Sequence, residues 1–192
     1  MAITKANILT AVKARTGRTE LTDIDTELEG ILRDLSSRWP FLEKVDATLT
    51  LTINVANMDL PADFRGVSAV KMTVTGAKLT PQTFGQLTAL LSANSTSGVP
   101  TRYAIFNDDL YVYPAPSSAL GVTMYYSYET GDSDSIPFAD CFREAITQGV
   151  CFKIYEGKSL LGEVAAADMH LKLYEQQIDV LKARYANRQV EG

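Results

Sequence analysis

The side chains that could support catalysis are few and scattered along the sequence. His170 is the only histidine, so a Ser-His-Asp or Cys-His mechanism would have to use it. No Gly-x-Ser-x-Gly motif is present to supply a partner nucleophile. His170 lies between Asp168 and Lys172 in an expected helix, and it is predicted to occupy a solvent-facing surface.

Three acidic pairs could in principle bind a metal ion or act as acid–base groups. The spacing of each pair favours a local structural role, at the start of a helix, in a turn or in a solvated loop. None has the spacing of an EF-hand loop or its bidentate glutamate. The pairs are Asp23 with Asp25, Asp108 with Asp109, and Asp132 with Asp134.

The two cysteines are ten residues apart in a segment expected to be helical. At a rise of about 1.5 Å per residue they would lie about 15 Å apart, too far for a disulfide. Cys141 and Cys151 are therefore predicted to be reduced packing residues made in a cytoplasm. Phosphate-cradling and dinucleotide-binding glycine motifs are also absent, so the sequence predicts no enzyme, no metal site and no cofactor.

The composition is that of an ordinary globular chain. The protein has 192 residues, 46% hydrophobic and 21% charged, with a formal net charge of −5. This balance argues against a protein that grips nucleic acid over a wide basic surface, but not against one that nucleic acid merely passes. No apolar run reaches the 18 residues of a spanning helix, and the first residues do not resemble a signal peptide.

Periodicity divides the chain into three parts and predicts an α+β fold. Residues 1–42 have the pattern of two helices, with Thr4 and Thr22 as expected caps. The second helix carries an apolar stripe made of Ile24, Leu28, Ile31, Leu32, Leu35 and Trp39. Residues 43–137 alternate as strands do, above all at 48–55, and an Asn-Asp pair at 107–108 predicts a hairpin. Residues 138–192 return to helix. We expect a helical bundle, made of the N-terminal helices and a long C-terminal helical hairpin, with an inserted antiparallel sheet region. The whole chain, 1–192, is predicted to be one domain.

The predicted last helix, from about residue 161 to residue 188, carries an apolar seam at steps of three and four residues. The seam comprises Val164, Ala167, Leu171, Tyr174, Ile178, Leu181 and Tyr185. The preceding helix is expected over about 138–156, with Gly149 near its middle. Glycine costs about 1 kcal/mol there relative to alanine, and a close approach of another helix is one reason to keep it.

In the strand region several tyrosines, including Tyr111, Tyr113 and Tyr126, are expected in cross-strand packing or a subunit interface.

Four phrases occur in a fixed order along the chain. They are Leu-Pro-Ala-Asp-Phe at 60–64, Gly-Val-Pro-Thr-Arg-Tyr-Ala-Ile at 98–105, Leu-Tyr-Val-Tyr-Pro-Ala-Pro at 110–116 and Val-Thr-Met-Tyr-Tyr at 122–126. With the helix pair that follows, the chain resembles the head-to-tail adaptor (connector, head-completion) proteins of tailed bacteriophages. The co-linear set carries the resemblance, because its prolines place turns at set positions between strands.

The resemblance implies a structural virion protein. Such adaptors form a ring, expected here to be a dodecamer, beneath the portal, where they extend the DNA channel and provide the tail attachment surface. The implied partners are the portal protein, a downstream tail or nozzle protein, and further copies of the chain. Genomic double-stranded DNA would pass through without specific binding, and no membrane is involved. The implied location is the head–tail neck of the virion, assembled in the host cytoplasm.

Two groups of residues follow as candidate contact sites. The alternative function, a non-virion soluble assembly chaperone or protein-binding module, stays open at this point. The candidate portal-binding residues are Tyr185, Asn187, Arg188, Gln189 and Val190. The candidate subunit-interface residues are Tyr111, Tyr113, Tyr126, Ile178 and Leu181.

Overall fold

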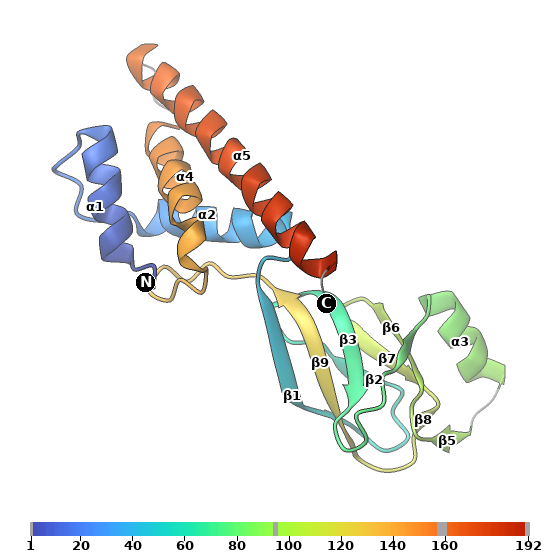
Figure 1. The fold of residues 1–192 in the computed structure, drawn as a ribbon. Helices are drawn as coiled ribbons and strands as arrows, with labels where there is room; N and C mark the ends of the chain where they lie inside the picture. The colour runs from blue at the N-terminus through green and yellow to red at the C-terminus, as the bar shows by residue number, and fades with distance from the viewer. Residues whose placement is uncertain (1, 94–95, 157–160, 191–192) are drawn as a thin grey trace. The chain divides into compact units, whose positions relative to one another are not determined.

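A computed structural model (Figure 1) describes residues 2–93, 96–156 and 161–190, and of Ala47, Leu161 and residues 187–190 it describes the backbone. The chain forms two compact units. Met1–Leu42 and Glu129–Gly192 make a helical unit, and Glu43–Tyr128 makes a sheet unit. The mixture of helices and sheets confirms the predicted α+β class. That the two units constitute one domain stays a prediction.

The helical unit is built around one central helix. α4 contacts α1, α2 and α5, and a short 3-10 helix, η1, leads into it. Every residue of α4 from Ala145 to Cys151 is buried, so this helix is covered on all sides over almost two turns. The bounds are α1 Lys5–Thr16, α2 Asp25–Arg38, η1 Asp140–Phe142, α4 Arg143–Tyr155 and α5 Leu161–Val190.

The first two helices follow their sequence signals with one exception. Thr4 caps α1 by accepting a hydrogen bond from the Asn7 amide at 3.3 Å, and Gly17 ends that helix in the left-handed region. Thr22 was predicted to cap the second helix, and this is wrong. The Asp23 carboxylate accepts hydrogen bonds from the amides of Ile24 and Asp25 instead, so α2 begins at Asp25.

Gly149 allows α2 and α4 to approach closely, as its position suggested. A β-carbon at Gly149 would lie 2.8 Å from Cδ1 of Ile31 and 3.0 Å from its Cγ2. Real β-carbons do not tolerate contacts this short. Ile31 is fully buried where the two helices cross. Gly149 therefore lowers the intrinsic stability of α4 but allows close packing between α2 and α4.

The sheet unit contains one three-stranded antiparallel sheet, ordered β1-β9-β3, in which the centre strand is the last in sequence (Figure 1). A four-stranded sheet has the order β2-β7-β6-β4, and β5 pairs with β8 in parallel. α3 packs against β6 and β7. The bounds are β1 Glu43–Leu51, β2 Asn57–Asp59, β3 Phe64–Met72, β4 Thr80–Pro81, α3 Phe84–Ala93, β5 Ser97–Gly98, β6 Arg102–Phe106, β7 Asp109–Tyr113, β8 Ala115–Pro116 and β9 Leu120–Tyr128.

Alternation along the strands builds the core of this unit. Val122, Met124 and Tyr126 of β9 point to one face and are fully buried. The predicted hairpin joins β6 to β7 through Asn107 and Asp108, both at positive φ, as a tight hairpin turn requires.

The strand expected over 48–55 differs from the prediction at both ends. It begins earlier, at Glu43, and stops at Leu51. The backbone of Asn54 is left-handed, with φ 58°, so residues 52–56 turn away from the sheet although their sequence continues to alternate. Backbone conformation at a single asparagine therefore overrides the hydrophobic pattern.

Candidate functional site

The long helix α5 presents one continuous face to the rest of its unit. Ala167, His170, Tyr174, Ile178 and Leu181 recur at intervals of three and four residues and are all buried. This confirms Ala167, Tyr174, Ile178 and Leu181 of the predicted seam. Val164 at its start is 44% exposed, and Leu171 is only half-buried.

The end of α5 is held by aromatic packing. The Tyr185 ring lies 5.3 Å from that of Phe41 and 5.7 Å from that of Phe142, both in edge-on geometry. Phe41 and Phe142 also contact each other at 5.0 Å. Tyr185, a candidate portal-binding residue, therefore has a packing role in its own chain. The side chains of the other candidates, Asn187, Arg188, Gln189 and Val190, lie outside the described residues.

The candidate interface residues occupy different environments. Ile178 and Leu181 are 0% and 2% exposed, and Tyr126 is fully buried, so their own chain already covers them. Tyr111 and Tyr113 are half-buried on β7. An interface role for this group stays a prediction, and only the two β7 tyrosines present surface for it.

Tyr126 is joined to the first family-like phrase. Its hydroxyl donates to Asp63 Oδ1 at 3.0 Å, and the Lys44 ammonium contacts Asp63 Oδ2 at 3.0 Å. The Phe64 ring lies 5.8 Å from the Tyr126 ring. The Leu-Pro-Ala-Asp-Phe phrase and the Tyr-Tyr strand therefore interlock, which gives these residues a structural role in the sheet unit.

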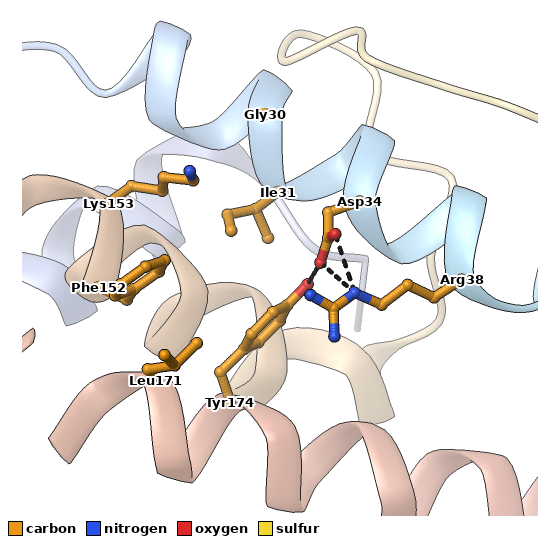
Figure 2. Close-up of a pocket in the computed structure, with 8 residues that line it drawn as sticks. All are labelled: Gly30, Ile31, Asp34, Arg38, Phe152, Lys153, Leu171 and Tyr174. Carbon is orange, nitrogen blue, oxygen red and sulfur yellow. Dashed lines mark hydrogen bonds and ion pairs between the residues drawn. The ribbon is translucent and has the colours of Figure 1, made fainter. Parts of the chain in front are cut away.

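A polar cluster joins α2 to α5 (Figure 2). The Tyr174 hydroxyl donates to Asp34 Oδ2 at 2.6 Å, and Arg38 Nε donates to the same carboxylate at 2.8 Å. Arg38 Nη1 also reaches Glu175 Oε1 at 2.6 Å. Burial, and then the bond to Asp34, raise the pKa of Tyr174 well above its usual range, so the phenol remains a donor at neutral pH.

These groups border a pocket of about 230 Å³ between α2, α4 and α5 (Figure 2). Ligand sites commonly enclose about 300–1,000 Å³, so this space is small for a substrate. Asp34, Arg38 and Tyr174 are engaged with one another, and Lys153 pairs with Glu156 outside the lining. The lining has no nucleophile beside a base. The lining residues are Gly30, Ile31, Asp34, Arg38, Phe152, Lys153, Leu171 and Tyr174.

The solvent-facing prediction for His170 is wrong. The side chain is 4% exposed and stacks on Tyr155 with ring centroids 5.8 Å apart. Its Nδ1 lies 2.6 Å from Gln148 Oε1. His170 is three residues after Ala167 and four before Tyr174, so its spacing in the seam predicts a buried position. The nearby charged residues Asp168 and Lys172 had suggested an exposed one.

A hydrogen-bonded chain leads from His170 to the first helix. Gln148 Nε2 donates to Glu144 at 2.8 Å, and Arg15 forms a two-pronged ion pair with Glu144 at 2.7 and 2.6 Å. Since the Glu144 carboxylate can only accept, the Gln148 amide oxygen faces His170, and Nδ1 of the histidine carries the proton. Arg15, Glu144, Gln148 and His170 thus connect α1, α4 and α5.

A second link runs alongside this chain. Arg18 pairs with Glu163 at 2.5 Å and lies over the Tyr155 ring, 5.1 Å from its centroid. The Tyr155 hydroxyl donates to the backbone carbonyl of Thr16 at 3.2 Å. None of these long-range partners was singled out from sequence, because the pairing depends on how the helices pack.

Acidification should destabilise the protein through His170. Burial, followed by the positive charge of Arg15, holds the pKa of this imidazole below its ordinary value of 6.5. The unfolded chain then takes up the proton at higher pH than the folded one, so the unfolding free energy falls as pH drops through 6.5 towards the folded pKa.

The measurement is the melting temperature between pH 7.5 and pH 5.5. His170→Gln, which cannot titrate, should show a shallower decline than the wild type. An equal slope in the two proteins would contradict a neutral buried histidine.

The acidic pairs behave as local structure. Asp23 and Asp25 pair with Lys5, Asp108 forms part of the hairpin turn, and Asp132 Oδ1 accepts from the Asp134 amide at 3.0 Å. Among the described residues, no three His, Cys, Asp or Glu side chains come together as a metal site would require. In the same ranges, no helix has the length and apolar character needed to cross a bilayer.

The two cysteines differ in their exposure to solvent. Cys151 is buried in α4, where burial raises the pKa of its thiol to about 11, as a packing residue requires. Cys141 is exposed in η1, so the prediction that it packs in the interior is wrong. It lies in the single 3-10 turn that precedes α4, outside the apolar face that continues to Cys151.

The charged and aromatic groups described above join helix to helix and strand to strand within each unit. A family model described as SU10 adaptor protein matches residues 3–191. The chain belongs to this family of phage head-to-tail adaptors, and it is a structural adaptor of the virion neck. A search of curated proteins finds no match.

Proposed function

We propose that this protein assembles as a ring of twelve copies beneath the portal, extends the DNA channel and provides the surface to which the tail attaches. The family match over residues 3–191 carries this proposal. The partners would be the portal protein, a downstream tail or nozzle protein and neighbouring copies of the chain. The helical bundle with its inserted sheet would be the repeating subunit, assembled in the host cytoplasm.

The charge of the chain supports passage of DNA without retention. The net charge is −5, and residues 43–137 hold five basic and nine acidic residues. Lys and Arg side chains in a channel lining would bind the DNA phosphates, and the release of counterions at each contact would favour retention of the DNA. An acidic or neutral lining makes no such contacts. Genomic DNA can then slide through the ring during packaging and ejection.

The last turns of α5 are proposed as the portal contact. Tyr185 is anchored by Phe41 and Phe142, so the residues after it continue from a supported point of the helix. The proposed contact comprises residues 187–190, with Tyr185 as its support. Tyr111 and Tyr113 are proposed as contacts between neighbouring copies of the ring.

Deleting residues 187–192 should abolish portal binding and leave folding almost unchanged. Leu181 is the last buried residue among the described side chains of α5, and the Tyr185 contacts remain in the shortened chain. A polar terminal stretch contributes little to a core. Melting temperature and co-sedimentation with purified portal measure the two effects separately.

Lys172→Ala, an exposed change on the same helix, is the control and should bind portal normally. A collapsed melting temperature in the shortened protein would show that the segment belongs to the fold. Normal portal binding by the shortened protein would place the contact elsewhere.

The proposed function itself is tested by deleting the gene and examining particles by electron microscopy. Heads without tails, either filled or leaking DNA, are the expected result. Intact infectious particles would end the proposal. Absence of the protein from purified virions, with assembly still impaired, would favour the alternative of an assembly chaperone or protein-binding module.

A further inference from the structure

One end of the sheet unit is formed by four segments, which include the short strands β5 and β8, and hydrogen bonds join three of these segments to one another. The Asn54 amide donates to the Pro116 carbonyl at 2.8 Å, and Ser97 Oγ donates to Asn54 Oδ1 at 2.7 Å. The Thr73 amide donates to the Gly121 carbonyl at 2.9 Å. We call this surface the loop end; it comprises residues 52–56, 73–77, 96–99 and 115–119, at the ends of β1 and β3 and the start of β9 (Figure 1).

The loop end exposes aliphatic side chains, and its own residues carry no charge; the exposed Lys78 borders it directly after Ala77. Ile53, Val55, Val74 and Val99 are 51%, 40%, 90% and 57% exposed. They are four of the nine large hydrophobic residues that are exposed in the described chain. None of the four loops contains Asp, Glu, Lys, Arg or His. Single exposed aliphatic residues are ordinary, but a group of them on one uncharged surface marks an interaction site.

Local turn requirements do not account for these side chains. The left-handed positions of the first two loops are taken by Asn54, at φ 58°, and Gly76, at φ 68°, which are the residue types such positions favour. Ile53, Val55 and Val74 occupy the remaining positions, where Ser, Asn or Asp would turn equally well. Hydrogen bonds hold three of the segments together, and the Thr73 amide ties the fourth to Gly121 of β9, so the side chains are presented from a preorganised surface.

The lack of charge restricts what can cover the loop end. Nucleic acid and anionic lipid both require Lys or Arg, and these loops have none. An uncharged, apolar recess on another protein fits the exposed β-branched side chains. The proposed portal contact lies on the helical unit, whereas the loop end belongs to the sheet unit, so the second partner of a head-to-tail adaptor remains for this surface.

We propose that the loop end docks into an uncharged, apolar recess of the tail protein that follows the adaptor in the virion. The inference rests on the proposed adaptor function and names the surface that serves its tail side. Ile53 and Val74 would be the inserted side chains, with Val55 and Val99 beside them.

The test uses adaptor-deficient heads and the purified downstream tail protein. Full-length protein carrying Ile53→Lys or Val74→Lys is added to the heads, and adaptor occupancy and tail-protein recruitment are measured separately. Met169→Lys and Val180→Lys are matched controls, because these residues are 51% and 48% exposed on α5. The serine variants Ile53→Ser and Val74→Ser remove the aliphatic groups without adding charge, and melting temperatures report folding.

We expect the lysine variants to occupy heads as the wild type does but to recruit tail protein at least about tenfold less well, as for a buried interface side chain. The controls should recruit it normally. Normal recruitment by all loop-end variants, with the wild type still occupying heads, would overturn this inference and leave the adaptor function standing.

Two other outcomes also decide the matter. If lysine variants lose ring formation or head occupancy, the loop end contacts a second copy or the portal, and the inference is wrong. If the wild type itself neither occupies heads nor recruits tail protein, the proposed adaptor function fails first. Binding of the wild type to uncharged phosphatidylcholine vesicles in preference to tail protein would assign the surface to lipid instead.

Discussion

Ile178→Asp should lower the free energy of unfolding by at least about 3 kcal/mol, through loss of a buried aliphatic side chain and burial of a carboxylate. Ile178 is completely covered on the inner face of α5, one turn from Tyr174 and Leu181. The neighbouring buried seam positions, Tyr174 and Leu181, supply no cation to pair with a new carboxylate. Chemical denaturation followed by circular dichroism measures the change.

Val180→Asp is the matched control for this experiment. The same substitution two residues away falls on a side chain that is 48% exposed, and it should change stability by no more than about 0.5 kcal/mol. Negligible loss of stability from Ile178→Asp would mean that the seam faces solvent in the free subunit. In that case the original hypothesis, that a neighbouring subunit covers Ile178 and Leu181, would be favoured.

Gly149→Leu is the second change expected to have a large effect, with a loss of about 1–3 kcal/mol. The added β-carbon alone would lie 2.8 Å from Ile31, so α2 and α4 would have to separate. The gain in helix propensity, about 1 kcal/mol, offsets only part of this cost. Thermal unfolding of the variant tests the prediction.

Two further proteins make the Gly149 experiment specific. Gly30→Leu, in the middle of α2 with nothing within 4 Å of the position of a β-carbon, should leave stability unchanged or slightly raised. Combining Gly149→Leu with Ile31→Ala should cost less than the two single changes added together, because the shortened side chain makes room. Strict additivity would show that the two residues do not meet.

Sequence periodicity predicted the helices and their inner faces well. The stripe of Leu28, Ile31, Leu32 and Leu35 is buried as its spacing indicates, and the Asn107–Asp108 turn joins its strands as expected. The errors at the ends of these elements occur where a single polar residue sets the local backbone structure. Asp23 displaced Thr22 as the acceptor at the start of α2, and Asn54 ended a strand whose alternation continued past it.

The partners in the polar contacts of the helical unit could not be predicted from the sequence, because they are far apart along the chain. Arg15 and Glu144 are 129 residues apart in sequence, and Tyr174 and Asp34 are 140 apart. Such pairs are set by the packing of the helices, and no local spacing encodes them. His170 was different, since its place in the seam was visible; charged neighbours on an adjacent face of the helix obscured it.

The division of the chain also sets an order of folding during synthesis. The sheet unit is one uninterrupted stretch, Glu43–Tyr128, whereas the helical unit combines segments from both sides of it. A ribosome therefore releases every strand before it makes α4, the helix against which α1 and α2 pack. Until then the apolar face of α2 has no partner, and the first helices must wait for the last. Translation that pauses after Tyr128 would leave a complete sheet beside an uncovered helix, which makes this stage the one most exposed to aggregation.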